Sequence, residues 1–229
     1  DLESVVVTGS GNFDMNTTTI VGDATNRVTL DAGALTGNVT AMVLNGTANA
    51  VNTVTSGGGT DTFSLDGIAG SAAGFNLTLG AGADTVSVTA NGDGATANMT
   101  INGGTGTDPL SLANTVNISA STVNLTSVEQ ITIAGAATVG SALVDGASLI
   151  INGGANSDLT VIVADSEIDL SSLAFTTAML DANDSVILDG SGNALSQAFT
   201  GSSIHDTITG GTGADVITGG AGDDVLAGG

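Results

Sequence analysis

Seven short segments of the chain end in an aspartate that follows a run of small residues rich in glycine. They fit, fully or in part, the nine-residue pattern G-G-x-G-x-D-x-U-x, in which U is a large apolar residue. Glycine permits positive φ angles and close backbone approach, so such a turn can direct its carbonyl oxygens toward one point while the aspartate adds a charge. Calcium takes roughly six to eight hard oxygen ligands, which carbonyl and carboxylate groups supply together. The pattern therefore predicts calcium-binding turns.

The pattern fits completely at residues 103–111, 210–218 and 219–227, and less completely at four other places. One turn cannot complete the coordination of an ion, so acids on neighbouring turns must cooperate. The candidate metal ligands are the seven aspartates of the pattern: Asp61, Asp84, Asp108, Asp158, Asp206, Asp215 and Asp224.

The spacing of these aspartates predicts how the turns are arranged. Successive gaps are 23, 24, 50, 48, 9 and 9 residues, and Asp184 falls near the middle of the second long gap. A coil of about 24 residues therefore recurs along most of the chain and tightens to 18 residues, two patterns per coil, at the end. In an 18-residue coil Asp206 and Asp224 share one side, about 4.8 Å apart along the axis, while Asp215 lies on the other side above the neutral Gln197. A divalent ion between two carboxylates turns their repulsion into attraction.

Short strands must position these turns. The segments NLTLGAGAD, NMTINGGTGTD and SLIINGGANSD each read as an alternating or apolar strand, then glycines, then the acid. Strand alternation turns Leu77 and Leu79, or Met99 and Ile101, toward one interior, and the apolar residue two places after each late aspartate also faces inward. We therefore predict an all-β protein, a right-handed parallel β-solenoid (β-helix) ending in a β-roll. Residues 1–200 form the solenoid, and residues 201–229 form a tandem-repeat roll continuous with it.

The charge excludes several classes of partner. Twenty-three acidic residues face one basic residue, Arg27, for a net charge of −22. Nucleic acids are poor partners for such a surface because phosphate binding needs Lys and Arg. No apolar run is long enough to span a bilayer, so membrane insertion is not expected. A compact fold with this charge repels itself unless cations neutralise it.

Catalysis is not expected either. The chain has no Lys and no Tyr, a single Arg and a single His, and neither a zinc-protease H-E-x-x-H motif nor a G-x-S-x-G nucleophile elbow. Solenoid enzymes that cleave acidic sugars need a base and cationic groups to stabilise carboxylate charge. We therefore predict that the protein is not an enzyme.

The nonapeptides resemble the RTX calcium-binding repeats of proteins exported by bacterial type I secretion. The resemblance implies a β-roll that orders on binding several Ca²⁺ ions, and a secreted, extracellular location. The Thr-, Ala-, Gly- and Asn-rich remainder, with phrases such as LTSVEQITIAG, is similar in style to RTX-type surface-layer proteins of Gram-negative bacteria. By analogy with the RTX family, the ligand loops comprise, besides the aspartates, Gly103, Gly104, Gly106, Gly210, Gly211, Gly213, Gly219, Gly220 and Gly222.

Two functions remain open. The first is a calcium-dependent structural protein of the bacterial cell surface that assembles with copies of itself into a surface layer, sheath or fibre. The second is a calcium-stiffened stalk of a secreted RTX adhesin or biofilm matrix protein. Cell-surface polysaccharide is a further candidate partner. Because the chain stops on the first two glycines of another repeat, we expect it to be a piece of a longer protein.

Overall fold

The computed structural model describes residues 4–21, 28–44, 51–66, 74–89, 97–180 and 183–229. Its regular structure is twenty-three β-strands and two short 3₁₀ helices, with no α-helix in the described ranges. Residues 1–112 and 120–130 form one compact unit, here unit 1, and residues 113–119 and 131–229 form a second, unit 2. Every strand pairing within each unit that the structure describes is parallel. Each unit is a parallel β-solenoid, as the sequence predicts.

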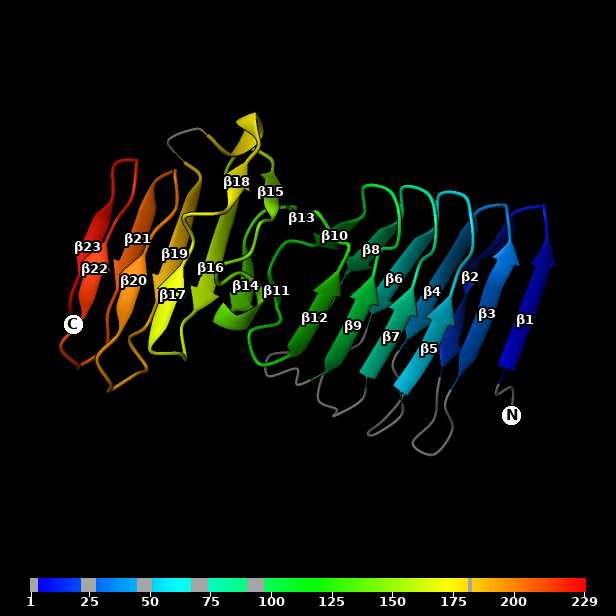
Figure 1. The fold of residues 1–229 in the computed structure, drawn as a ribbon, viewed down its shortest axis with the longest axis horizontal. Helices are drawn as coiled ribbons and strands as arrows, with labels where there is room; N and C mark the ends of the chain where they lie inside the picture. Colours follow the sequence, from blue (N-terminus) through cyan, green and yellow to red (C-terminus); the bar gives the residue numbers. More distant parts are fainter. Residues whose placement is uncertain (1–3, 22–27, 45–50, 67–73, 90–96, 181–182) are drawn as a thin grey trace. The chain divides into compact units, whose positions relative to one another are not determined.

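Unit 1 contains two stacks of strands (Figure 1). One sheet has the order β1 (Ser4–Gly9), β3 (Thr29–Leu35), β5 (Val51–Thr55), β7 (Gly74–Thr78), β9 (Asn98–Asn102) and β12 (Thr122–Thr126). The other runs through β2 (Phe13–Val21), β4 (Val39–Leu44), β6 (Thr62–Asp66), β8 (Thr85–Val88) and β10 (Pro109–Leu112). Each coil therefore contributes one strand to each sheet, with the candidate calcium turns on the connections from the first sheet to the second.

Unit 2 has three sheets. One has the order β11 (Val116–Asn117), β14 (Ala137–Gly140), β16 (Asp158–Ile162), β19 (Ser185–Asp189), β21 (Asp206–Thr209) and β23 (Val225–Ala227). A second consists of β17 (Glu167–Asp169), β20 (Ala198–Thr200) and β22 (Val216–Thr218), and a third contains β13 (Gln130–Ile133), β15 (Ile150–Gly153) and β18 (Ala174–Phe175). The 3₁₀ helices are η1 (Ser141–Leu143) and η2 (Thr177–Met179).

The register confirms the two predicted coil lengths. In unit 1, paired residues are 22 to 26 positions apart, from Thr40 with Thr62 to Phe13 with Val39. At the end of unit 2 the step is 18, as between Thr207 and Val225. The steps between are less regular and reach 31 where β17 pairs with β20. Strands β21 and β22 pair with β19 and β20, so residues 201–229 continue the coils before them.

The core lies inside the coils, where strand alternation predicts it. Leu77, Leu79, Met99 and Ile101 are all buried. Ile208 is also fully buried, whereas Leu226, in the final strand β23, remains 49% exposed. Aliphatic side chains therefore stack along the interior, and the last coil is the least covered.

Candidate metal centre

A column of acids runs through the turns of unit 1, one acid per coil. The backbone N–H of Val39 donates to Asp61 Oδ1 at 2.7 Å, and that of Asp61 donates to Asp84 Oδ1 at 2.8 Å. The Asp84 N–H donates to Asp108 Oδ1 at 2.8 Å, and the Asp108 N–H to Glu129 Oε2 at 3.0 Å. We call Asp61, Asp84, Asp108 and Glu129 the acid column. In it, one oxygen of each carboxylate caps the backbone of the coil before.

The second oxygen of each aspartate in the column is buried without a partner. The Oδ2 atoms of Asp61, Asp84 and Asp108 accept no hydrogen bond from any part of the chain that the structure describes, and the three residues are at most 1% exposed. Burial raises the pKa of all three carboxyl groups, that of Asp84 to about 6, where the neighbouring charges of Asp61 and Asp108 add to the shift. An unsatisfied buried acceptor is costly, more so when it is charged. The column therefore favours a proton or a cation at these oxygens.

Glycine is required where these turns stack. Gly82 and Gly106, at the fourth position of their patterns, have φ of +144° and +151°. A Cβ on either would overlap the carbonyl oxygen of the fourth-position glycine one coil earlier, Gly59 or Gly82. The turns are also linked directly, since the Ala81 and Thr105 N–H groups each donate at 2.8 Å to a carbonyl of the preceding turn. Glycine therefore brings successive turns into backbone contact.

The turns at the end of unit 2 follow the predicted 18-residue step on both sides. The Asp206 N–H donates to Asp224 Oδ1 at 3.1 Å, and the Gln197 N–H donates to Asp215 Oδ1 at 2.8 Å. The structure thus brings Asp206 and Asp224 together on one side and places Asp215 with Gln197 on the other. The aspartate cap of unit 1 recurs here in a shorter coil.

The two sides differ in how many oxygens are left open. Both carboxylate oxygens of Asp206 accept hydrogen bonds from Ser202, Oδ2 from its N–H at 2.7 Å and Oδ1 from its hydroxyl at 2.9 Å. Burial nevertheless raises the pKa of Asp206 to about 6, with the charge of Asp224 contributing. On the other side, Asp215 Oδ2 and Gln197 Oε1 are buried and find no donor among the described residues.

The predicted ligand-loop glycines lie against their own aspartates. A Cβ on Gly103 would lie 2.7 Å from Asp108 Oδ2, and one on Gly210 or Gly219 would overlap the carboxylate of Asp215 or Asp224. The second and fourth positions have positive φ in the turns of Gly104 and Gly106 and of Gly220 and Gly222, but not in the turn of Gly211 and Gly213. The Asp215 turn therefore has a different backbone conformation.

Asp158 does not occupy the capping position of its coil. It pairs in register with Ser185, whose hydroxyl donates to Asp158 Oδ1 at 2.7 Å. The capping contact is made one residue earlier, where the Ser157 N–H donates to Asp184 Oδ1 at 2.7 Å, and Asp184 Oδ2 has no partner in the described ranges. Sequence reasoning missed Glu129 as the end of the acid column, because it is a glutamate outside any glycine-rich pattern. The only signal was its distance of 21 residues from Asp108.

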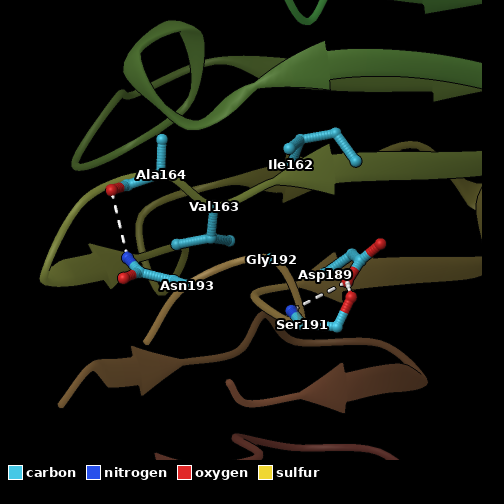
Figure 2. Close-up of a pocket in the computed structure, with 7 residues that line it drawn as sticks. All are labelled: Ile162, Val163, Ala164, Asp189, Ser191, Gly192 and Asn193. Atoms are coloured by element: carbon cyan, nitrogen blue, oxygen red, sulfur yellow. Dashed lines mark hydrogen bonds between the residues drawn. The ribbon is translucent and has the colours of Figure 1, made fainter. Parts of the chain in front are cut away.

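A pocket of about 450 Å³ lies in unit 2 beside the turn at residues 189–193 (Figure 2). It is lined by Ile162, Val163, Ala164, Asp189, Ser191, Gly192 and Asn193. Its one titratable side chain, Asp189, accepts hydrogen bonds at Oδ1 from the N–H and hydroxyl of Ser191, at 3.0 and 2.6 Å. The Asn193 amide donates to the Ala164 carbonyl at 3.1 Å across it. The hydrogen bond from Asn193 to Ala164 therefore links the turn at residues 189–193 to the preceding coil.

The residues present fit calcium. No three His, Cys, Asp or Glu side chains gather as a metal-binding group in the described part of the chain. A site here must therefore combine few carboxylates with backbone and amide oxygens, a mixture that calcium accepts. Unpartnered buried oxygens on Asp215 and Gln197, and turns into which only glycine fits, provide such a setting. On the opposite side of the coil, Asp224 and Asp206 are the corresponding carboxylates.

Comparison with known families agrees with this chemistry. Residues 200–229 match the model of the RTX calcium-binding nonapeptide repeat, which spans four copies. No curated protein and no solved structure gives a significant match to the chain. Among the described residues, no helix is long and apolar enough to cross a membrane. RTX repeats imply calcium binding and are typical of secreted bacterial proteins, so the chain is a parallel β-solenoid that ends in RTX calcium-binding repeats.

Proposed function

We propose that the chain is part of a calcium-dependent structural protein of the bacterial cell surface, which assembles with copies of itself into a surface layer, sheath or fibre. The observation that carries the proposal is the continuity of the RTX turns with the solenoid. The 18-residue coils of β20 to β23 extend the coils before them and pair with them strand by strand. Calcium bound at these turns would stiffen coils that are continuous with the rest of unit 2 rather than a separate module.

The charge supports a role for calcium in assembly. With one basic residue against 23 acidic ones, two copies repel each other at neutral pH. Divalent cations reduce that repulsion both within and between copies. Acids also lie on the strands, among them Asp31, Glu167 and Asp189, so cations at the turns remove part of the barrier to contact.

No catalytic role is part of this proposal. The chain lacks Lys and Tyr, and its one His, His205, lies in the last coils, where its Nδ1 accepts the Asp223 N–H at 3.1 Å. A surface so acidic also disfavours nucleic acid as a partner. The remaining alternative is the calcium-stiffened stalk of an RTX adhesin or matrix protein, in which a binding site elsewhere carries the function.

Electron microscopy and sedimentation of the chain, with calcium and with chelator, test the proposal. We expect ordered arrays or fibres in calcium and dispersed chains in chelator. The double variant Asp215→Asn/Asp224→Asn should abolish calcium-dependent assembly. The matched control Asp223→Asn removes one exposed charge from the same turn and should assemble normally. A chain that folds in calcium but stays monomeric would contradict self-assembly and favour the stalk.

A further inference from the structure

The acid column of unit 1 lies outside the residues that match the RTX repeat, yet two of its turns share the backbone conformation of the last RTX turn. Gly80 and Gly82, and Gly104 and Gly106, have positive φ at the second and fourth positions of their patterns, as do Gly220 and Gly222 in the matched stretch. The aspartate follows two residues after the fourth position in all three turns. Unit 1 thus repeats an RTX turn conformation in a coil of about 24 residues.

The column also contains oxygens that need a partner. Each aspartate uses Oδ1 to cap the coil before and leaves Oδ2 buried, as described above for Asp61, Asp84 and Asp108. In Asp108 this oxygen points into its own turn, against Gly103. Three such oxygens recur at successive coils, a spacing of about 4.8 Å.

Basic side chains cannot satisfy these oxygens from within the described coils. The only basic residue other than His205 is Arg27, which lies outside the described residues, and the chain has no Lys. Carboxylates this close repel one another, and a divalent cation changes that repulsion into attraction. Hard oxygen donors from carboxylates and backbone select Ca²⁺ over softer metals.

We infer that the acid column is a second calcium-binding locus, in which Oδ2 of Asp61, Asp84 and Asp108 are ligands and Glu129 supplies the terminal carboxylate. Backbone carbonyls of the glycine turns and water complete the coordination. This inference deepens the proposed function, and rests on it, because it extends the calcium dependence of the RTX turns to unit 1. Calcium binding then extends from the RTX turns at residues 206–224 to the turns at residues 61–129.

Counting bound calcium in the full chain tests the inference. Equilibrium dialysis at neutral pH would compare the wild type with Asp84→Asn/Asp108→Asn, in which each asparagine keeps an oxygen to accept the backbone N–H and loses only the charge. We expect this variant to bind at least one calcium ion fewer per chain than the wild type. The control Asp31→Asn alters an exposed acid of unit 1 whose Oδ1 caps Gly33, and should bind as many ions as the wild type. Magnesium in place of calcium should compete poorly, because it requires a tighter octahedral site.

The RTX variant Asp215→Asn/Asp224→Asn separates this inference from the proposed function. If it loses calcium ions while the column variant does not, the inference is overturned and the RTX sites stand. If only the column variant loses ions, the column is confirmed and the calcium basis of the proposed function fails. A wild type that is stabilised at acidic pH as the column variant is not, while both bind the same number of calcium ions, would show that protons satisfy the column and would overturn the inference.

Hydrogen exchange on the unmodified chain covers the case in which the column variant fails to fold. The amides of Asp61, Asp84 and Asp108 donate within the column, so calcium should slow their exchange at least tenfold. Exchange at these amides that is identical in calcium and in chelator would overturn the inference.

Discussion

The turns of unit 1 and the RTX turns of unit 2 use the same aspartate in two coils of different size. In both, Oδ1 accepts the backbone N–H of the equivalent residue one coil earlier, whether the step is 24 residues to Asp108 or 18 to Asp224. The coils differ in how many turns they carry, since unit 1 has one acidic turn per coil and the end of unit 2 has two. The backbone hydrogen bonds between successive turns differ in length too. The N–H groups of Ala81 and Thr105 donate to the preceding turn at 2.8 Å, whereas those of Thr212 and Ala221 donate at 3.1 and 3.3 Å.

This comparison separates two roles of one side chain. The Oδ1 cap is structural and independent of coil length, so it explains why aspartate recurs wherever a glycine turn precedes a strand. The Oδ2 atom is the proposed cation ligand, and its state varies from turn to turn: it is open in Asp84, Asp108 and Asp215 but occupied by Ser202 in Asp206. We therefore expect calcium binding to depend on the residue at the second pattern position as well as on the acid.

Replacing a fourth-position glycine should have the largest effect on stability, and a larger one in unit 1 than in the RTX turns. Gly106→Ala places a Cβ on the Gly82 carbonyl at a φ of +151°, so we expect a loss of about 3 kcal/mol or more in the free energy of unfolding. Gly222→Ala, in the last coil, should cost about 1–2 kcal/mol because fewer contacts depend on it. Urea unfolding monitored by circular dichroism measures both.

Gly154→Ala is the control for these two changes. It has no atom within 4 Å of its added Cβ and no positive φ, and should change stability by less than about 0.5 kcal/mol. Equal losses from Gly106→Ala and Gly222→Ala would show that the turns of the two regions are equally constrained.

Calcium removal should affect the RTX turns more than unit 1. Binding to the folded state alone adds about 2.7 kcal/mol per site at a hundredfold excess over Kd. The last coil has little apolar burial to replace that contribution, since Val216 and Val225 are 67% and 62% exposed. Unit 1 retains a core that includes fully buried Phe63 and Leu65.

Hydrogen exchange with mass spectrometry, in calcium and in chelator, measures this difference. Residues 206–227 should lose protection first on chelation, and the strands of unit 1 should open later or not at all. Uniform loss of protection along the chain would show that calcium holds both regions equally.

The sequence predicted the fold and the pairing of residues between successive coils well, because both depend on the spacing of residues along the chain. Strand alternation located buried Leu77 and Ile101, and the nine-residue gaps placed Asp206 with Asp224 and Gln197 with Asp215. These are one-dimensional periodicities, and parallel coiling converts them directly into neighbours in space.

The sequence did not predict every capping contact. These contacts depend on strand register to a single residue and on which nearby hydrogen-bond donors reach each carboxylate. Asp158 fits the pattern by eye, but the strand places Ser157 and Asp184 on the capping row. Ser202 occupies both oxygens of Asp206, a contact that requires the actual turn conformation. Glu129 joins the column because its longer side chain reaches the Asp108 N–H from a turn without the pattern.

The stability of the fold should depend on pH in opposite directions with and without calcium. Burial raises the pKa of Asp84 and Asp206 from 3.8 to about 6 in the folded chain. Between about pH 4 and 6 the folded state then binds more protons than the unfolded state, so without calcium stability falls as the pH rises through this range. The change is on the order of 2 kcal/mol for each carboxyl group. Because bound calcium requires the ionised form, its presence should make stability rise with pH instead.

Thermal unfolding at pH 4.5 and 7.5, each with calcium and with chelator, measures the sign of both slopes. The variant Asp84→Asn should flatten the slope in chelator through unit 1, and Asp206→Asn should flatten it through unit 2. If stability in chelator increased from pH 4.5 to 7.5, these carboxylates would be ionised and satisfied without calcium.

The smallest expected effect concerns Gln197, which distinguishes one side of the RTX coils from the other. Its N–H donates to Asp215 Oδ1 and its Nε2 to the Asp165 carbonyl, at 2.8 Å each, while Oε1 is buried without a donor among the described residues.

Gln197→Glu keeps the length of the side chain, removes the Nε2 donor and adds a second charge beside Asp215. In chelator this should cost about 1–2 kcal/mol, because a buried charge is added without a partner. In calcium the same charge becomes a ligand, and since affinity rises with the number of charged ligands, binding on this side should tighten several-fold. Calorimetric titration of calcium measures the change, and Asp215→Asn should move affinity in the opposite direction. The contrary outcome is that Gln197→Glu leaves calcium affinity unaltered while still lowering stability in chelator. That result would show that the ion on this side lies away from the side chain of residue 197, and that Asp215 is the one side-chain ligand there.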